Sequence, residues 1–333
     1  MRILGIESSC DETAAAILKD GRHLLANIVN SQIAVHSKYG GVVPELASRK
    51  HIENIAAVVR QALDQAELEL TDIDAIAVTQ GPGLVGSLLV GLSFAKALSY
   101  VRNIPYVGID HMAGHLSSVM LGADIPMFPA VALIVSGGHS NLYHMTSMTD
   151  YSLIGRSRDD AAGEAFDKAA KILGLDYPGG PIVSRLAEAG GRQAISFPRA
   201  WLEEDSFDFS FSGIKTALAN YVRQLPGKPD SAHLGDICAS FQEAIVEVLA
   251  VKTIKAAISH GVQNIVAAGG VAANPRLRQL LQENAERYGL TMYIPEAKFC
   301  TDNAAMIAMA GAIRIAQEGT YALDLDVYSR PCS

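Results

Sequence analysis

The sequence lacks the long apolar runs of a membrane protein and the apolar leader of a secreted one. No window of its 333 residues approaches the ~18 unbroken apolar residues of a membrane-spanning helix, so we expect no membrane partner. The N-terminal stretch MRILGIESSCDET becomes polar and acidic within seven residues. It therefore has no signal-peptide core and predicts a first β-strand instead.

Cysteine and net positive charge are also scarce. The cysteines form no CxxC pair and are scattered at Cys10, Cys238, Cys300 and Cys332. This pattern excludes a disulfide-dense scaffold, and we expect a reduced, cytoplasmic protein. The formal net charge of −8 argues against broad, non-specific DNA binding, which needs many lysine and arginine contacts to phosphate. It leaves room for a local basic patch or for a partner that supplies positive charge.

The residues that are present suit packed cores. Hydrophobic residues make up 49% of the chain and charged residues 19%, and the length corresponds to about two domains of ~150 residues. Strand-like and helix-like stretches alternate along the chain, which predicts an α/β architecture.

The order of these stretches occurs twice. The first half predicts a strand, a hairpin around Asp20-Gly21, a helix, a strand, a glycine-rich loop, a helix, a strand and a helix. The same order recurs from residue 130. We therefore predict two similar lobes, residues 1–125 and 126–333, with 176–232 inserted in the second. The helix after 302 could pack back on the first lobe.

Four turns lie at matched positions of this duplication: 7–13, 81–87, 136–141 and 269–274. Glycine-rich turns at the ends of strands offer backbone N–H groups and helix N-termini to phosphate. One such turn is weak evidence. Four at equivalent positions predict two lobes around a nucleotide cleft.

The stretch DHMAGH indicates a metal site. It places His111 and His115 one helical turn apart after an apolar strand, close enough to share an ion. The duplication sets the helix containing Asp302 opposite this turn. Two histidines and one carboxylate with open positions suit catalytic Fe(II) or Zn(II). One alternative is that the two histidines are merely exposed residues of a helix. Another is that Asp302 is a helix N-cap or first-turn residue, unless Thr301 caps the helix and leaves Asp302 free.

The first histidine is not followed by glutamate. The stretch is HMAGH rather than HExxH, so the general base of a zinc metalloprotease is missing. A peptidase is therefore disfavoured.

The motifs together resemble one family. They are GIESSCDET, GGVVPELASR, GPGLVGSLLVG, DHMAGH, VSGGH, DDAAGEAFDKAAKILGLDYPGGP, FSFSGIKT, AAGGVAAN and CTDNAAM, in order from residue 3 to about 316. The sequence is similar to the bacterial TsaD family, which forms N6-threonylcarbamoyladenosine (t6A) at position 37 of tRNAs reading ANN codons. The resemblance implies a duplicated ribonuclease-H-like fold of the actin-like ATPase (ASKHA) superfamily.

The resemblance also implies site residues. The family's metal ligands fall on His111, His115 and Asp302, with one divalent metal per subunit, Fe²⁺ favoured and Zn²⁺ the alternative. Its nucleotide contacts fall on Ile134, Val135, Ser136, Gly137, Gly138, Asp167, Gly180 and Asn274. Many members have aspartate where this chain has Ser184, so a second ribose contact would depend on that hydroxyl. ATP or ADP could occupy the cleft in place of the adenylate.

The implied reaction is acyl transfer. The N6 amine of adenine 37 attacks the carbamoyl carbonyl of L-threonylcarbamoyl-adenylate and AMP leaves, with a metal to stabilise charge on oxygen. We expect Glu12, beside Asp11, to position or deprotonate the amine. The alternative is a carboxylate merely solvated in a turn.

The implied partners are tRNA, a TsaB-like paralogue and a TsaE-like ATPase. Candidate tRNA contacts are Lys38, Arg49, Lys50, His51, Arg199 and Lys215. A small-molecule kinase on the same fold is the main competing function. It would need no site of two histidines and one carboxylate, and the first turn lacks the DxGxT pattern of sugar kinases.

Overall fold

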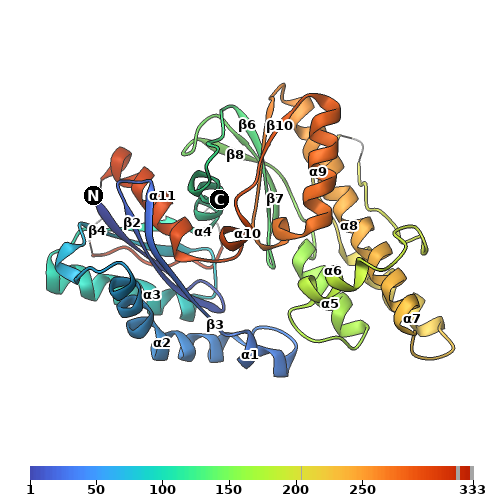
Figure 1. Ribbon diagram of the computed structural model, residues 1–333, viewed down its shortest axis with the longest axis horizontal. Helices are drawn as coiled ribbons and strands as arrows, with labels where there is room; N and C mark the ends of the chain where they lie inside the picture. The colour runs from blue at the N-terminus through green and yellow to red at the C-terminus, as the bar shows by residue number, and fades with distance from the viewer. Residues whose placement is uncertain (204, 320–322, 331–333) are drawn as a thin grey trace. The chain divides into compact units, whose positions relative to one another are not determined.

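The computed structural model describes residues 1–203, 205–319 and 323–330. It forms two compact units, which are described separately (Figure 1). Unit 1 comprises Met1–Asp124 and the chain from Asp302 onward, and unit 2 comprises Ile125–Thr301. The helix after 302 thus belongs to the first unit, which is the arrangement allowed for beside the predicted division at residue 125.

Unit 1 is built on a mixed five-stranded sheet in the order β3-β2-β1-β4-β5. Its strands are β1 (Arg2–Glu7), β2 (Glu12–Lys19), β3 (His23–Ser31), β4 (Ala75–Gly81) and β5 (Tyr106–Asp110). The β1, β2 and β3 strands pair antiparallel, while β4 and β5 extend the sheet in parallel. The Asp20-Gly21 turn between β2 and β3 has φ values of 54° and 61°, as a tight hairpin turn requires.

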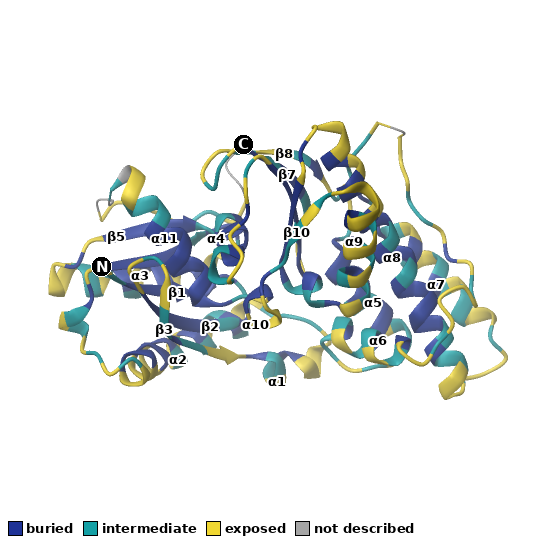
Figure 2. Ribbon diagram, turned by 45° about the horizontal axis from the view of Figure 1, so that its top comes forward, coloured by how far each residue is buried: buried dark blue, intermediate teal, exposed yellow. Residues whose placement is uncertain are grey.

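Two of the helices of unit 1, α2 and α3, cover one face of this sheet, and α11 covers the other (Figure 2). The helices of the unit are α1 (Ile33–His36), α2 (Pro44–Gln65), α3 (Val85–Arg102), α4 (His111–Ser117) and α11 (Ala304–Glu318), with short 3-10 turns at Ser37–Tyr39, Leu70–Asp72 and Ser118–Leu121. Successive β1 side chains point to opposite faces. Leu4 and Ile6 pack with α2 and α3, and Ile3 packs with α11. The apolar face of α11 thus completes the core of unit 1, which explains the return of the chain after Asp302.

Unit 2 repeats the topology. Its sheet has the order β10-β9-β6-β7-β8, with β6, β7 and β8 antiparallel and β9 and β10 parallel. The strands are β6 (Ala130–Val135), β7 (Ser140–Met145), β8 (Tyr151–Arg156), β9 (Asn264–Ala268) and β10 (Thr291–Tyr293). Strand for strand, this is the arrangement of unit 1, so the predicted duplicated α/β fold is confirmed.

The core of unit 2 surrounds one long helix, α8 (Ser231–Ser259), which packs against aromatic and aliphatic side chains from the sheet and from several helices. The others are α5 (Ala162–Ile172), α6 (Gly179–Ala187), α7 (Ser212–Gln224), α9 (Pro275–Tyr288), α10 (Ala297–Cys300) and the 3-10 turn η4 (Gly270–Ala273). The expected insertion, 176–232, contains α6 and α7.

Cys10, Cys238 and Cys300 are free thiols, and Cys332 lies outside the described residues. Within the described chain, no helix combines the length and apolar character that crossing a bilayer requires.

A close approach of α11 to β4 makes unit 1 sensitive at Gly311. A Cβ atom there would lie 2.4 Å from the Cβ atom of Ala77. We predict that Gly311→Ala lowers the free energy of unfolding by about 1–3 kcal/mol through overpacking. The control is Gly213→Ala on α7, where an added Cβ meets nothing within 4 Å. Calorimetric melting should show a lower Tm for the first variant only, and equal Tm values would contradict the packing described.

Candidate functional site

The two histidines are positioned by the start of α4. Asp110, the last residue of β5, caps the helix, and its Oδ1 accepts from the backbone N–H groups of Met112 at 2.8 Å and Ala113 at 3.1 Å. His111 is therefore the first helical residue and His115 follows one turn later. Their rings meet edge to face with centroids 4.7 Å apart.

Asp302 reaches the same place from the far end of unit 1. Its Oδ1 lies 3.5 Å from Nε2 of His111 and 3.2 Å from Nε2 of His115. The cap of α11 is Asn303, whose side chain accepts from the N–H of Met306, rather than Thr301. Asp302 therefore has no capping role. The three predicted ligand atoms all lie within 4.8 Å of one another.

The burial of His115 tests whether these residues suit a metal. Its side chain is fully buried, and among the described residues neither ring nitrogen makes a hydrogen bond of ordinary geometry, although Nε2 lies 3.2 Å from Asp302 Oδ1. Leaving a buried polar nitrogen unsatisfied costs about 1–3 kcal/mol. A cation on Nε2 would satisfy one of these two atoms, and the two-histidine, one-carboxylate set is chemically suited to Fe(II) or Zn(II). The residues therefore fit a metal ion.

Glu7 orients the first ligand and was not predicted from the sequence. Its Oε2 lies 3.1 Å from Nδ1 of His111 and accepts from the Thr79 hydroxyl at 2.7 Å. Its Oε1 accepts from the N–H of Ser9, whose hydroxyl lies 3.2 Å from the same histidine nitrogen. With Nδ1–H directed to Glu7, Nε2 is the nitrogen that faces Asp302 and that a metal would bind after losing its proton, as in carboxylate–histidine–metal triads.

The charges in this cluster stabilise one another. Burial alone would lower the pKa of His111, but the carboxylates of Asp302 and Glu7 raise it well above its ordinary value. Burial alone would raise the pKa of both carboxyls, yet His111 brings the pKa of Glu7 below its ordinary value and that of Asp302 far below. Without a cation, His111 carries a proton that a metal must displace.

Asp11 lies in the turn between β1 and β2, and Glu12 is the first residue of β2. Asp11 is buried, and Glu12 Oε1 accepts from the Ser31 hydroxyl at 3.0 Å. Burial first, and then the charges of Asp11 and Asp302, raise the pKa of Glu12 to about 9. Glu12 is thus an electrostatically coupled neighbour of the metal cluster rather than a solvated turn residue. A bound cation would lower the pKa of Glu12.

His51 holds this same turn and is fully buried, so its prediction as a tRNA contact is wrong. Its Nε2 lies 3.0 Å from the carbonyl oxygen of Cys10, to which it donates, and its Nδ1 lies 2.8 Å from the Thr13 hydroxyl. Burial lowers the pKa of His51 and keeps the ring neutral. The sequence around His51 is rich in charged residues, so nothing in it indicated a buried histidine that holds the turn after β1.

The predicted nucleotide residues lie in unit 2. After β6, the turn at Ser136 closes by a bond from its N–H to the His139 carbonyl at 2.8 Å. Added Cβ atoms at Gly137 and Gly138 would meet nothing within 4 Å, so this backbone is open to a ligand. Ile134 and Val135 are fully buried strand residues, and their side chains belong to the core.

The α5 helix connects this turn to Asp167. At its start, an added Cβ on Gly163 would lie 2.7 Å from the Cα of Gly137. One turn further on the same face, Asp167 Oδ1 accepts from the N–H of Gly179 at 2.8 Å. This bond fixes the start of α6, where Gly180 is open to its surroundings. The α5 helix thus connects the turn at Gly137, through Gly163 and Asp167, to the start of α6 at Gly179.

Asn274 and Ser184 lie beside one cavity. Asn274 caps α9 by accepting from the N–H groups of Arg276 and Leu277, and its amide donates to Gln242 Oε1 at 2.7 Å. Ser184, on α6, lines a cavity of about 160 Å³ together with Gln242 and Arg276. Gln242 and Arg276 were not predicted.

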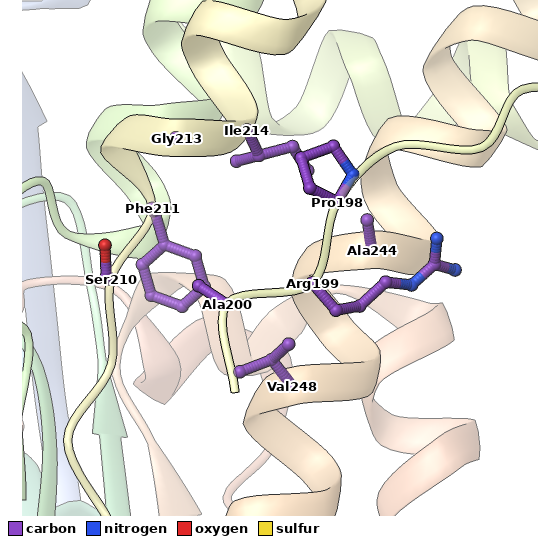
Figure 3. A pocket seen from close by; sticks show the side chains of 9 residues that line it. All are labelled: Pro198, Arg199, Ala200, Ser210, Phe211, Gly213, Ile214, Ala244 and Val248. Carbon is purple, nitrogen blue, oxygen red and sulfur yellow. The ribbon is translucent and has the colours of Figure 1, made fainter. Parts of the chain in front are cut away.

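A second cavity of unit 2, of about 70 Å³, is largely apolar and lies between the segment at Pro198 and the helices α7 and α8 (Figure 3). The guanidinium of Arg199 points away from it and pairs with Glu247 at 2.9 Å. Lys215 pairs with Asp160 at 2.8 Å. These two predicted tRNA contacts are therefore already neutralised by carboxylates.

Comparison with known proteins identifies close relatives. The sequence profile of TsaD, described as tRNA N6-adenosine threonylcarbamoyltransferase, matches residues 23–309. A protein of that name from Desulfotalea psychrophila is 53% identical over 99% of this chain and 97% of the relative. One from Clostridioides difficile is 52% identical over 97% of this chain and 96% of the relative.

Solved structures share the fold at low identity. Full-length HypF, in a phosphate- and nucleotide-bound form, aligns with a TM-score of 0.62 at 13% identity, covering 96% of this chain and 47% of HypF. Component A of (R)-2-hydroxyglutaryl-CoA dehydratase from Acidaminococcus fermentans aligns with a TM-score of 0.54 at 18% identity, covering 95% of this chain and all of that one (100%).

The raised pKa of His111 predicts pH-dependent metal binding. Because a cation must displace the His111 proton, affinity for Zn²⁺ should rise with pH and level off only above the raised pKa. Calorimetric titrations in buffers of different ionisation enthalpy would measure the proton released. Glu7→Gln removes one carboxylate that raises this pKa, so the rise should move to lower pH. A pH-independent affinity would contradict the buried ion pair.

Proposed function

Because the chain belongs to the TsaD family of tRNA N6-adenosine threonylcarbamoyltransferases, we propose that it forms t6A in tRNA. The group transferred is threonylcarbamoyl, from L-threonylcarbamoyl-adenylate to N6 of adenine 37 in tRNAs reading ANN codons. The observation that carries this proposal is 53% identity to a relative of that name over 99% of the chain. The geometry of each unit supplies the parts that the reaction needs.

The cation site is formed by His111, His115 and Asp302. When bound there, Fe²⁺ or Zn²⁺ would supply a Lewis acid for the oxygen that gains negative charge. Three protein ligands leave positions open for substrate, as catalytic sites require. Glu7 keeps the lone pair of the neutral His111 Nε2 directed to this site.

Unit 2 supplies the groups for the adenylate. The open turn Ser136–Gly138 suits phosphate, since its backbone is not covered by side chains. Asp167 suits the ribose hydroxyls, and Gly180 allows a flat base to approach the first turn of α6. Ser184 lines the neighbouring cavity, where its hydroxyl can donate and accept, and Asn274 is bonded to the lining residue Gln242.

Glu12 is the proposed proton acceptor, with Asp11 beside it. When N6 attacks the carbamoyl carbon, a C–N bond forms, the bond from that carbon to the phosphate oxygen breaks, and N6 loses a proton. Glu12 accepts this proton only as a carboxylate. Its pKa of about 9 in the cation-free protein would be lowered by a bound cation, which prepares it for this role.

The proposed setting is the cytoplasm, with a TsaB-like paralogue and a TsaE-like ATPase as partners. Phosphate contacts dominate RNA affinity, so a chain with a net charge of −8 would bind an anticodon loop better with a partner that supplies positive charge. Arg49 remains exposed on α2 and, among the described residues, pairs with the exposed Glu45.

The metal ligands provide the first test. Purified protein, partners, threonylcarbamoyl-adenylate and an unmodified ANN-decoding tRNA should give t6A, measured by mass spectrometry of nucleosides. We predict that His115→Ala and Asp302→Ala each abolish both bound metal and t6A. The control His233→Ala removes a histidine of unit 2 that contacts Tyr221 instead. Phosphorylation of a small molecule without t6A would instead support a kinase, and full metal content in either variant would show that the ligand set is wrong.

Glu12 provides the second test. Glu12→Gln keeps the shape but cannot accept a proton, so we predict that kcat falls about 10²- to 10⁴-fold while the KM for the adenylate changes little. Glu53→Gln, at an exposed carboxylate of α2, is the matched control. Wild-type kcat in the Glu12 variant would assign the proton transfer to another group.

A further inference from the structure

The chain after α11 returns across the sheet of unit 1. The described segment Leu323–Arg330 has no helix or strand, yet Leu325 and Val327 pack against the core beneath α2 and α3. Its backbone is held at Gln80, the penultimate residue of β4. The Tyr328 N–H donates to the Gln80 carbonyl at 3.2 Å, and the Gln80 amide donates to the Asp326 carbonyl at 2.7 Å.

Two glycines make room for this segment. A Cβ atom on Gly81, whose φ is +155°, would lie 2.1 Å from the Tyr328 carbonyl oxygen. A Cβ atom on Gly108 in β5 would lie 2.5 Å from a methyl group of Leu325. Both strands that precede the candidate metal site are therefore shaped to receive residues 325–328. Residues 325–328 are therefore packed against unit 1.

The seating ends in one side-chain contact. The Tyr328 hydroxyl donates to Asp110 Oδ2 at 2.6 Å. The other oxygen of Asp110, Oδ1, accepts from the first N–H groups of α4, which begins with the metal ligand His111. One carboxylate thus joins the C-terminal segment to the helix that carries both histidines.

We propose that Tyr328 is a positioning residue for the metal centre. An N-cap carboxylate bonded through one oxygen can still turn about its χ2 angle, and a bond to the second oxygen removes that freedom. Fixing Asp110 fixes the first turn of α4, and with it the direction of His111 and His115. This inference rests on the proposed function only in that it assumes a cation at those ligands.

The test is metal binding by Tyr328→Phe, which removes only the hydroxyl. Metal-free wild-type and variant proteins are titrated with Co²⁺, whose visible absorption reports both affinity and coordination geometry. Changes around metal ligands cost about 10- to 100-fold in affinity, and for this more distant contact we expect an increase in Kd of about 3- to 30-fold with an altered spectrum. The control is Tyr100→Phe, at a tyrosine of the same unit that is 78% exposed.

A double-mutant cycle separates positioning from general stability. Asp110→Ser retains a capping oxygen for α4 but removes the partner of the Tyr328 hydroxyl. In that background, Tyr328→Phe should change the Co²⁺ affinity no further. A Tyr328→Phe protein that melts at a lower temperature but binds Co²⁺ with wild-type affinity and spectrum would overturn the inference and leave the proposed function intact. A wild-type protein that binds no Co²⁺ would overturn both.

Discussion

The buried contact between Glu7 and His111 is the interaction on which the candidate metal centre depends. A carboxylate with no access to water is costly unless donors surround it. Glu7 has them from the Ser9 backbone, the Thr79 hydroxyl and the His111 ring. These donors come from β4, from the turn after β1 and from α4, so satisfying one carboxylate requires all three to end at the same point. The resulting direction of Nδ1–H leaves the opposite nitrogen for a cation.

The packing of α11 brings a distant part of the chain to the candidate metal site of unit 1. The α11 helix covers one face of the sheet with apolar side chains, and its N-terminal end delivers Asp302 to two histidines almost two hundred residues earlier. Because the side chain of Asn303 accepts the hydrogen bond from the first turn of α11, the Asp302 carboxylate does not serve as the helix cap. Tertiary packing therefore places the ligand, and local capping leaves it available.

The sequence predicted the duplication and the ligand trio, since both depend on spacing and order that can be read directly. It did not predict Glu7, because the sequence pattern IESS does not distinguish a buried carboxylate from a solvated one. His51 was misassigned to a surface for the same reason: a neutral, buried histidine and an exposed one have the same letter. The segment around Tyr328 has no hydrophobic period of a helix or strand, so its seating on Gly81 and Gly108 became visible only in three dimensions.

The two units share one topology but differ in the charge of the residues that follow their first strands. After β1, the first strand of unit 1, come Asp11 and then Glu12, the first residue of β2. The cluster beside them holds further carboxylates, an environment that favours a cation. After β6, the equivalent strand of unit 2, the turn carries the exposed Gly137 and Gly138, where an added Cβ would meet nothing within 4 Å, an environment that leaves room for an anion. Strand order and direction are the same in both units. The proposed difference between the units, a metal site in unit 1 and an anion site in unit 2, therefore rests on the residues that follow equivalent strands and not on strand order, which the units share.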